Sequence, residues 1–105
     1  MNLIPMIECY CDEFGRQWQV VFLDFPPAVE GIGEKRTLWS IWLEVGSQLE
    51  LVYQSRSINY TAAERQVRRR LKDLTAQPPS AEHRYREATS RINLITSCVR
   101  ELKAA

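Results

Sequence analysis

Alternating hydrophobic and polar residues in the first half of the chain predict a set of β-strands. Turn-forming residues separate the segments: Gly15 after the first, two prolines and two glycines within residues 26–36, and Gly46 with Ser47 before the last. The four segments that carry this pattern are residues 3–11, 17–25, 37–45 and 48–55. Because each follows the previous one closely along the chain, the simplest arrangement is a four-stranded antiparallel β-meander.

The second half instead shows apolar residues spaced three and four apart, which is typical of amphipathic helices. A first helix is expected over residues 62–75, and Thr61 with Glu64 fits a capping box at its start. Pro78 and Pro79 end this helix because they cannot continue its hydrogen bonds. The apolar stripe of this helix consists of Tyr60, Ala63, Val67, Leu71 and Leu74.

A second helix is expected from an N-cap at Ser80 to Lys103. Its apolar positions are Ala81, Tyr85, Ala88, Ile92, Ile95, Val99 and Leu102. Their spacing alternates between four and three residues, which suits close packing against another helix. The predicted fold class is therefore α+β, with a four-stranded antiparallel sheet followed by a C-terminal two-helix hairpin in a single domain over residues 1–105.

Two strands carry more apolar side chains than one face of a sheet can bury. Residues 17–25 are apolar on both faces, and Trp42 lies on the face opposite Trp39. Either the sheet curls into a small barrel with the helices outside, or the helices cover one face and a partner covers the other. Trp42 and Leu38 are candidate interface residues on the second interpretation. On the first, Trp42 packs inside the curled sheet or beneath residues 26–36.

Charge divides the chain at the same point as secondary structure. Residues 1–60 carry 4 Lys or Arg against 8 Asp or Glu, net −4, whereas residues 61–105 carry 10 against 5, net +5. The sheet half is therefore acidic and the helical half basic, although the whole chain of 105 residues has a formal net charge of only +1. Such a balance argues against non-specific DNA binding but is compatible with a one-sided binding surface.

The basic charge gathers on one side of the first helix. At about 100° per residue, four cations lie opposite Val67, the centre of the apolar stripe: Arg65, Arg68, Arg69 and Lys72. Arg70 instead borders the stripe, and Glu64 and Asp73 are placed to pair with Arg68 and Arg69. The cationic ridge, as we call these four residues, has three interpretations: it binds an acidic protein surface, it follows a phosphate backbone, or it is simply solvated.

The second helix is longer than the first, about 36 Å against about 21 Å, so the first cannot cover all of it. Leu94 lies away from the main stripe and widens the apolar surface over the later turns. A homodimer, a partner protein or the domain's own sheet could bury this overhang. We expect Leu94 to lie at an interface.

Residues with catalytic or metal-binding chemistry are few. Cys9 and Cys11 share one face of the first strand, where we expect buried free thiols rather than half of a zinc site. His83, the single histidine, has no Ser or Cys beside it in a recognisable motif and is expected at the surface. We therefore predict no catalytic residues, no metal, no cofactor and no enzyme activity.

The sequence predicts a small non-enzymatic binding protein, an adaptor, regulator or inhibitor that docks on a larger protein or complex. The contact would use the cationic ridge, the Trp42 face, or both, and a homodimer is a further expectation. The alternative is a nucleic-acid-binding module that places the same ridge on phosphates. No segment is apolar enough to span a membrane and the N-terminus lacks a secretion signal, so a cytoplasmic location is expected.

Overall fold

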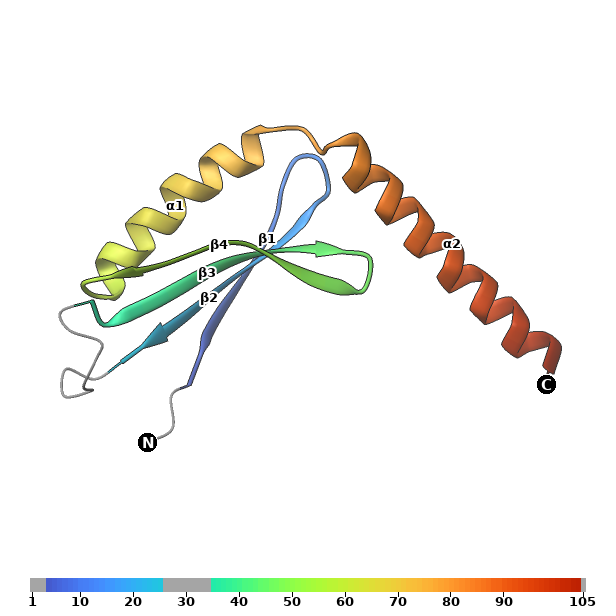
Figure 1. Ribbon diagram of the computed structural model, residues 1–105, viewed down its shortest axis with the longest axis horizontal. Helices are drawn as coiled ribbons and strands as arrows, with labels where there is room; N and C mark the ends of the chain where they lie inside the picture. Colours follow the sequence, from blue (N-terminus) through green and yellow to red (C-terminus); the bar gives the residue numbers. More distant parts are fainter. Residues whose placement is uncertain (1–3, 26–34, 105) are drawn as a thin grey trace.

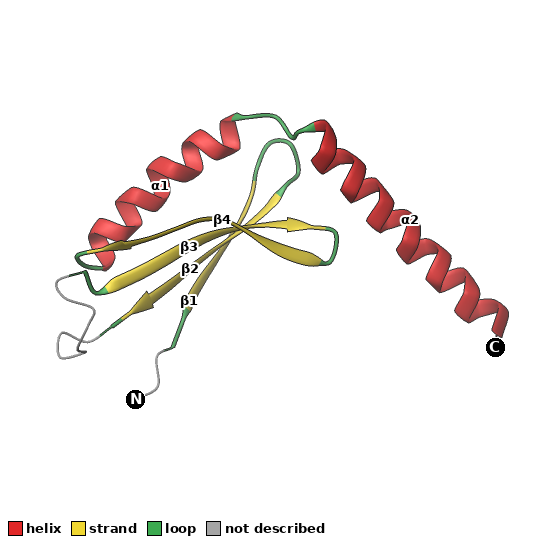
Figure 2. Cartoon of the chain, in the orientation of Figure 1, coloured by secondary structure: helices red, strands yellow, loops and turns green. Residues whose placement is uncertain are grey.

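The computed structural model contains one open antiparallel sheet followed by two helices, which confirms the predicted α+β class. It describes residues 4–25 and 35–104, and only the backbone at positions 93–95, 97, 98 and 101–104. The strand order is β1-β2-β3-β4, as in a meander (Figures 1 and 2). The elements are β1 Met6–Cys11, β2 Gln17–Asp24, β3 Thr37–Val45, β4 Gln48–Ser57, α1 Tyr60–Ala76 and α2 Ala81–Ala104.

The core lies between α1 and one face of the sheet. Alternate residues of β2 and β3 point to this face, and the register pairs Phe22 with Trp39 and Val20 with Ile41. The buried apolar cluster consists of Trp18, Val20, Phe22, Trp39, Ile41, Ala63, Val67 and Leu71. Since the last three come from the apolar stripe predicted for α1, helical periodicity correctly identified the buried side of that helix.

One buried polar chain joins the sheet to α1. The Trp39 indole Nε1 donates a hydrogen bond to Ser57 Oγ at 2.9 Å, and Ser57 Oγ donates to Gln66 Oε1 at 2.7 Å. Each step satisfies a polar group that would otherwise lose its hydrogen bond to water on burial. These two hydrogen bonds therefore fix the position of α1 relative to β3 and β4 more specifically than apolar packing alone would.

The start of α1 differs from the sequence prediction. Asn59, not Thr61, is the N-cap, because its extended backbone lets its side chain accept a hydrogen bond from Ala62 N at 2.9 Å. The helix therefore begins at Tyr60, and the capping box predicted at Thr61 is wrong. At the start of α2 the prediction is confirmed, since His83 N donates to Ser80 Oγ at 3.0 Å.

The two helices do not pack along each other, so the predicted close pairing in a hairpin is wrong. In the described part of the chain, α1 packs against β2, β3 and β4, whereas α2 contacts only the end of the sheet near the β3–β4 turn and extends away from the body (Figure 1). The radius of gyration, 17.9 Å, reflects this projection. A compact chain of this length would have a value of about 13 Å.

The base of α2 is attached to the turn between β3 and β4. Glu87 accepts a hydrogen bond from Gly46 N at 3.2 Å, and Arg86 forms an ion pair with Glu50. Gly46 has φ +64, and a Cβ added there would overlap the Ser90 hydroxyl. Glycine is therefore required at this position both by the backbone and by the close approach of α2.

Cys9 and Cys11 share one face of β1, as predicted, but both are exposed, so the prediction of buried thiols is wrong. Their face is the one turned away from α1, and β1 lies at the edge of the sheet. Among the described residues, no helix is both long enough and apolar enough to cross a membrane.

Candidate docking surfaces

The cationic ridge lies on the solvent side of α1. Arg65, Arg68, Arg69 and Lys72 are all exposed, while the apolar stripe on the other side of the helix is buried. Arg70 borders the core as predicted: its guanidinium lies 4.0 Å from the centre of the Tyr53 ring and donates to the Tyr53 hydroxyl at 3.0 Å.

Only part of the ridge is neutralised by neighbouring carboxylates. Arg68 pairs with Glu64, as the i, i+4 spacing predicted. The predicted pair between Asp73 and Arg69 is not formed among the residues that the structure describes. In the same part of the chain, Arg65, Arg69 and Lys72 have no ion-pair partner, so a ligand would meet three uncompensated cations.

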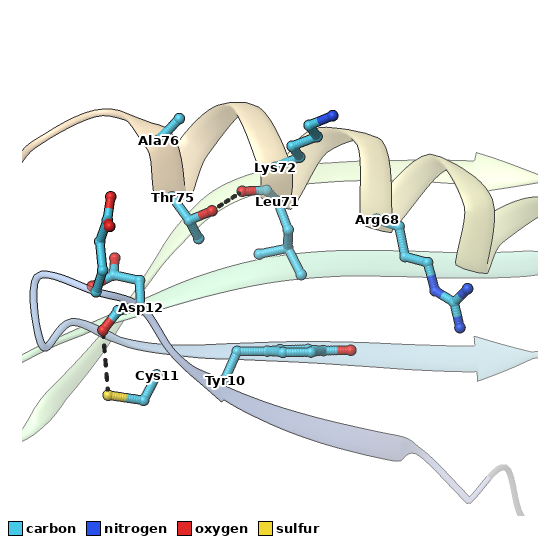
Figure 3. A pocket seen from close by; sticks show the side chains of 9 residues that line it. Tyr10, Cys11, Asp12, Arg68, Leu71, Lys72, Thr75 and Ala76 are labelled. Carbon is cyan, nitrogen blue, oxygen red and sulfur yellow. Dashed lines mark hydrogen bonds between the residues drawn. The ribbon is translucent and has the colours of Figure 1, made fainter.

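A groove lies beside this ridge, between α1 and β1 (Figure 3). Its volume is about 630 Å³. Arg68, Leu71 and Lys72 line it from the helix, and Tyr10 lines it from the strand. The remaining lining residues are Cys11, Asp12, Glu13, Thr75 and Ala76. Half of the cationic ridge therefore borders a concave site.

The groove exists because α1 does not reach over the edge of the sheet. The helix packs on β2, β3 and β4, and no contact between α1 and β1 of comparable extent occurs among the described residues. Two β1 side chains on the helix side therefore stay exposed, Met6 at 42% and Tyr10 at 38%. Within the described residues β1 pairs with β2 alone, so its other edge presents backbone N–H and C=O groups without a sheet partner there.

Tyr10 stays protonated in this groove. Its hydroxyl donates a hydrogen bond to Glu8 Oε2 at 2.5 Å, and this bond, followed by burial and the charge of Glu8, raises the pKa of Tyr10 to about 12. Burial and the carboxylates of Glu8 and Glu64 likewise raise the pKa of Tyr60. Tyr10 therefore presents a neutral phenol to the groove, hydrogen-bonded to the carboxylate of Glu8.

A buried ion pair fixes one end of the groove. Asp12 Oδ2 lies 2.6 Å from Arg16 Nε, and the two side chains are 2% and 8% exposed. Arg16 Nη2 also donates to the carbonyls of Leu74 and Gln77, the last turn of α1, where a cation is favourable. The turn between β1 and β2 is thereby tied to the end of α1.

The Asp12 carboxylate is held ionised despite its burial. Desolvation alone would raise its pKa, but hydrogen bonds from Trp18 Nε1, from the Arg16 backbone and from the Arg16 side chain outweigh it and lower the pKa. Asp12 was not among the residues that the sequence predicted to form a site. The signal that could have revealed the pair was the spacing of Asp12 and Arg16 around the turn glycine at position 15.

Trp42 and Leu38 lie on the sheet face opposite α1. Both are half-buried, and the Trp42 indole Nε1 donates to Ser40 Oγ at 2.8 Å on the same face. The sheet is open rather than curled into a barrel, and neither helix covers this face within the described part of the chain. The ridge and the Trp42 face therefore lie on opposite sides of the molecule. The side chain of Leu94 lies outside the described residues, as do residues 26–34.

The residues considered for catalysis are dispersed. His83 lies on α2, where its Nε2 is 4.0 Å from Glu87 Oε1, whereas Cys9 and Cys11 lie on β1. Within the residues described, no three His, Cys, Asp or Glu side chains are grouped so that they could hold a metal ion. Comparison of the chain with protein family models, curated proteins and solved structures finds no match.

Proposed function

We propose that this chain is a non-enzymatic binding protein whose α1–β1 groove holds an acidic, extended segment of a larger partner protein. The observation that carries the proposal is the position of the edge strand β1 directly beside Arg68 and Lys72, with no element of the described chain between them. Bound in this way, the chain would act as an adaptor, regulator or inhibitor of that partner.

The edge of β1 supports an extended ligand rather than a helical one. An added strand would pair with the N–H and C=O groups that β2 leaves unused, which is the usual mode of strand addition. Such a strand would lie about 4.8 Å from β1, along the edge of the sheet that α1 leaves uncovered. There it would also cover Met6 and Tyr10, the exposed side chains on the helix side of β1.

Charge supports an acidic sequence in that segment. Alternate side chains of an added strand would point toward α1, where Arg68 and Lys72 line the groove. Carboxylates at those positions would form charge-assisted hydrogen bonds with the two cations. The side chains between them would point to the other face of the sheet, beside Cys9 and Cys11.

Nucleic acid fits the same surface less well. Glu13 lines the groove, Glu8 lies beside Tyr10, and Glu64 already pairs with Arg68. A phosphate backbone, with its regular negative charge, would approach these carboxylates as closely as it approaches the ridge. A peptide can place neutral residues opposite them, so protein is the better match.

A cytoplasmic location is part of this proposal. Cys9 and Cys11 are free and exposed on one face of the edge strand. Exposed thiols so close together persist in a reducing compartment but are readily oxidised outside it.

The test is fluorescence anisotropy with labelled probes over a salt series. A peptide of alternating Glu and Val carries the proposed charge and strand character. A peptide of alternating Glu and Pro keeps the charge but lacks half of the backbone donors. A peptide of alternating Lys and Val reverses the charge. Generic duplex and single-stranded DNA complete the set. We expect only the Glu-Val peptide to bind tightly.

Three double variants locate the site. Arg68→Glu/Lys72→Glu removes the groove cations and should weaken Glu-Val binding by about tenfold or more. Arg84→Glu/Arg100→Glu makes the same charge change at exposed positions of α2 and should have little effect. Arg65→Glu/Arg69→Glu alters only the outer part of the ridge and should have an intermediate effect.

Each contrary result has a defined meaning. Equal binding of the Glu-Val and Glu-Pro peptides would overturn strand addition, since charge alone would then suffice. DNA binding that falls steeply with salt and depends on Arg65 and Arg69 would establish the nucleic-acid alternative instead. Absence of Glu-Val binding at low salt would overturn the groove as a docking site for acidic segments.

A further inference from the structure

The second helix turns its apolar side away from the body. Glu87 and Ser90 lie against Gly46, so their side of α2 is the one that faces the sheet. At about 100° per residue, the described apolar side chains of α2 are centred about 160° away from them, namely Ala81, Tyr85, Ala88, Ile92 and Val99. In agreement, Tyr85 is 73% exposed, Ile92 62% and Val99 43%. The polar side of the helix is thus docked and the apolar side is left to solvent.

This stripe has the seven-residue repeat of a coiled coil. Tyr85, Ile92 and Val99 are each seven residues apart and occupy one heptad position, a, while Ala81 and Ala88 occupy the second, d. The stretch from Ala81 to Val99 spans about 27 Å of helix, close to the three heptads over which such a pattern is informative. We call these five residues the α2 seam.

No other described element of the chain can cover the seam from within. The apolar residues of α1 are already buried on the sheet: Ala63, Val67 and Leu71. The sheet is on the opposite side of α2, reached through the turn at Gly46. A helix with the same heptad repeat is the complementary surface, because a and d side chains fit the gaps between a and d side chains of a facing helix.

A second copy of the chain supplies that helix. We infer that α2 pairs with α2 of another copy through the seam, forming a homodimer whose bodies lie on the outer sides of the helix pair. Charge does not oppose this pairing. In a parallel pair, Arg84 and Arg91 beside the seam face Thr89 and Thr96 of the second copy rather than another cation. The inference is independent of the proposed groove, which lies on α1 and β1.

The test is the molar mass of the full chain in solution over a range of concentrations, measured by sedimentation equilibrium. Wild type is expected to be a dimer that dissociates on dilution. Ile92→Asp places a charge in the seam and should be monomeric throughout, because burying an unpaired charge costs more than the seam can supply. The matched control is Arg100→Asp, which puts the same side chain at an exposed position outside the seam and should behave as wild type.

A second variant, which should strengthen the dimer, shows whether Ile92→Asp acts on the dimer contact or on the structure of α2. Ala88→Leu enlarges a d position with the side chain favoured there, so it should strengthen dimerisation by about tenfold or more. Helix content from circular dichroism should stay the same in the monomeric Ile92→Asp variant. A wild type that is monomeric at every concentration would overturn the inference. So would a dimer indifferent to Ile92→Asp and Ala88→Leu, which would place the contact on the open sheet face or the β1 edge.

Discussion

The two helices have similar amphipathic sequences but use them in opposite ways. In α1, the apolar stripe is buried on the sheet and the cations face solvent. In α2, polar side chains contact the sheet and the α2 seam faces solvent. The periodicity of a sequence thus shows that a helix has an apolar side, but what that side packs against is decided elsewhere in the molecule. In α2, the contacts with the turn at Gly46 and with Glu50 of β4 determine which side of the helix faces the sheet.

The sharpest test of this comparison makes the same substitution in both helices. Val67→Asp places a charge at a side chain that is 1% exposed and should lower the free energy of unfolding by about 4 kcal/mol or more. Val99→Asp, at a side chain left open to solvent, should change it by less than about 1 kcal/mol at concentrations where the chain is monomeric. Urea denaturation of both variants measures the difference. Similar losses would show that α2 is buried in the monomer after all.

Removing the attachment of the C-terminal end of α1 to the β1–β2 turn should cause the next largest loss of stability. Arg16→Met leaves the Asp12 carboxylate buried without its cation and removes two hydrogen bonds to the end of α1. The expected loss is about 3 kcal/mol in urea denaturation at neutral pH. Arg36→Met, at a half-buried arginine directly before β3, serves as the control. An equal loss in both would mean that the ion pair has no special role.

The same ion pair predicts a pH dependence. Because the pKa of Asp12 is lowered in the folded state, its ionised form contributes stability above the unfolded pKa of about 4. That contribution is lost as pH falls through the lower folded value. The free energy of unfolding of the wild type should therefore fall steeply as the pH is lowered. Asp12→Asn should be less stable than the wild type at neutral pH, but its free energy of unfolding should vary less with pH. If the free energy of unfolding fell equally steeply with decreasing pH in both proteins, this assignment would be contradicted.

Substitutions at two glycines distinguish the effect of the contact between α2 and the Gly46 turn from the effect of backbone strain. Gly15 and Gly46 both have positive φ, but an added Cβ meets nothing at Gly15 and the Ser90 side chain at Gly46. Gly15→Ala should cost about 1 kcal/mol from strain alone. Gly46→Ala should cost about 1–2 kcal/mol more, or displace α2, since the same strain is joined by overlap. Equal costs would show that α2 does not approach the turn this closely.

The smallest expected effect is a change in the pKa of Tyr10, which lines the groove. The hydrogen bond to Glu8 holds the pKa of Tyr10 at about 12, so Glu8→Gln should bring it back toward the ordinary value of 10.0. The bond stabilises the fold fully below the unfolded pKa and is lost as pH rises through the folded one. Ultraviolet absorbance of the phenolate follows this titration, with Tyr10→Phe identifying the transition. An unchanged titration in Glu8→Gln would exclude the bond.

Much of the fold was predictable because short-range patterns determine it. The four strands occur in the predicted order, with turns at Gly15 and Gly46 that require positive φ. The buried side of α1 follows from its periodicity. The helix start was misplaced because Asn59 and Thr61 are both good N-caps, and only the direction of the incoming chain after β4 distinguishes them.

The candidate site was predictable only in part. A helical wheel found the cationic ridge, because it needs nothing beyond α1 itself. It could not find the groove, which depends on how far α1 extends across the sheet and on β1 lying at its edge. Cys9 and Cys11 show the same limit: their common face follows from strand geometry, whereas its exposure depends on an element that would have to cover it.

Because α2 is attached to the body near its N-terminal end, a small rotation there moves its C-terminal end over a large distance. Among the described side chains, its contacts with the body come from Arg86, Glu87 and Ser90, all within the first ten residues of an element 24 residues long. A helix of that length extends about 36 Å, so a rotation of about 10° at its base moves its tip by about 6 Å. Small adjustments at the Gly46 turn are thereby converted into large displacements of whatever the far end of α2 carries.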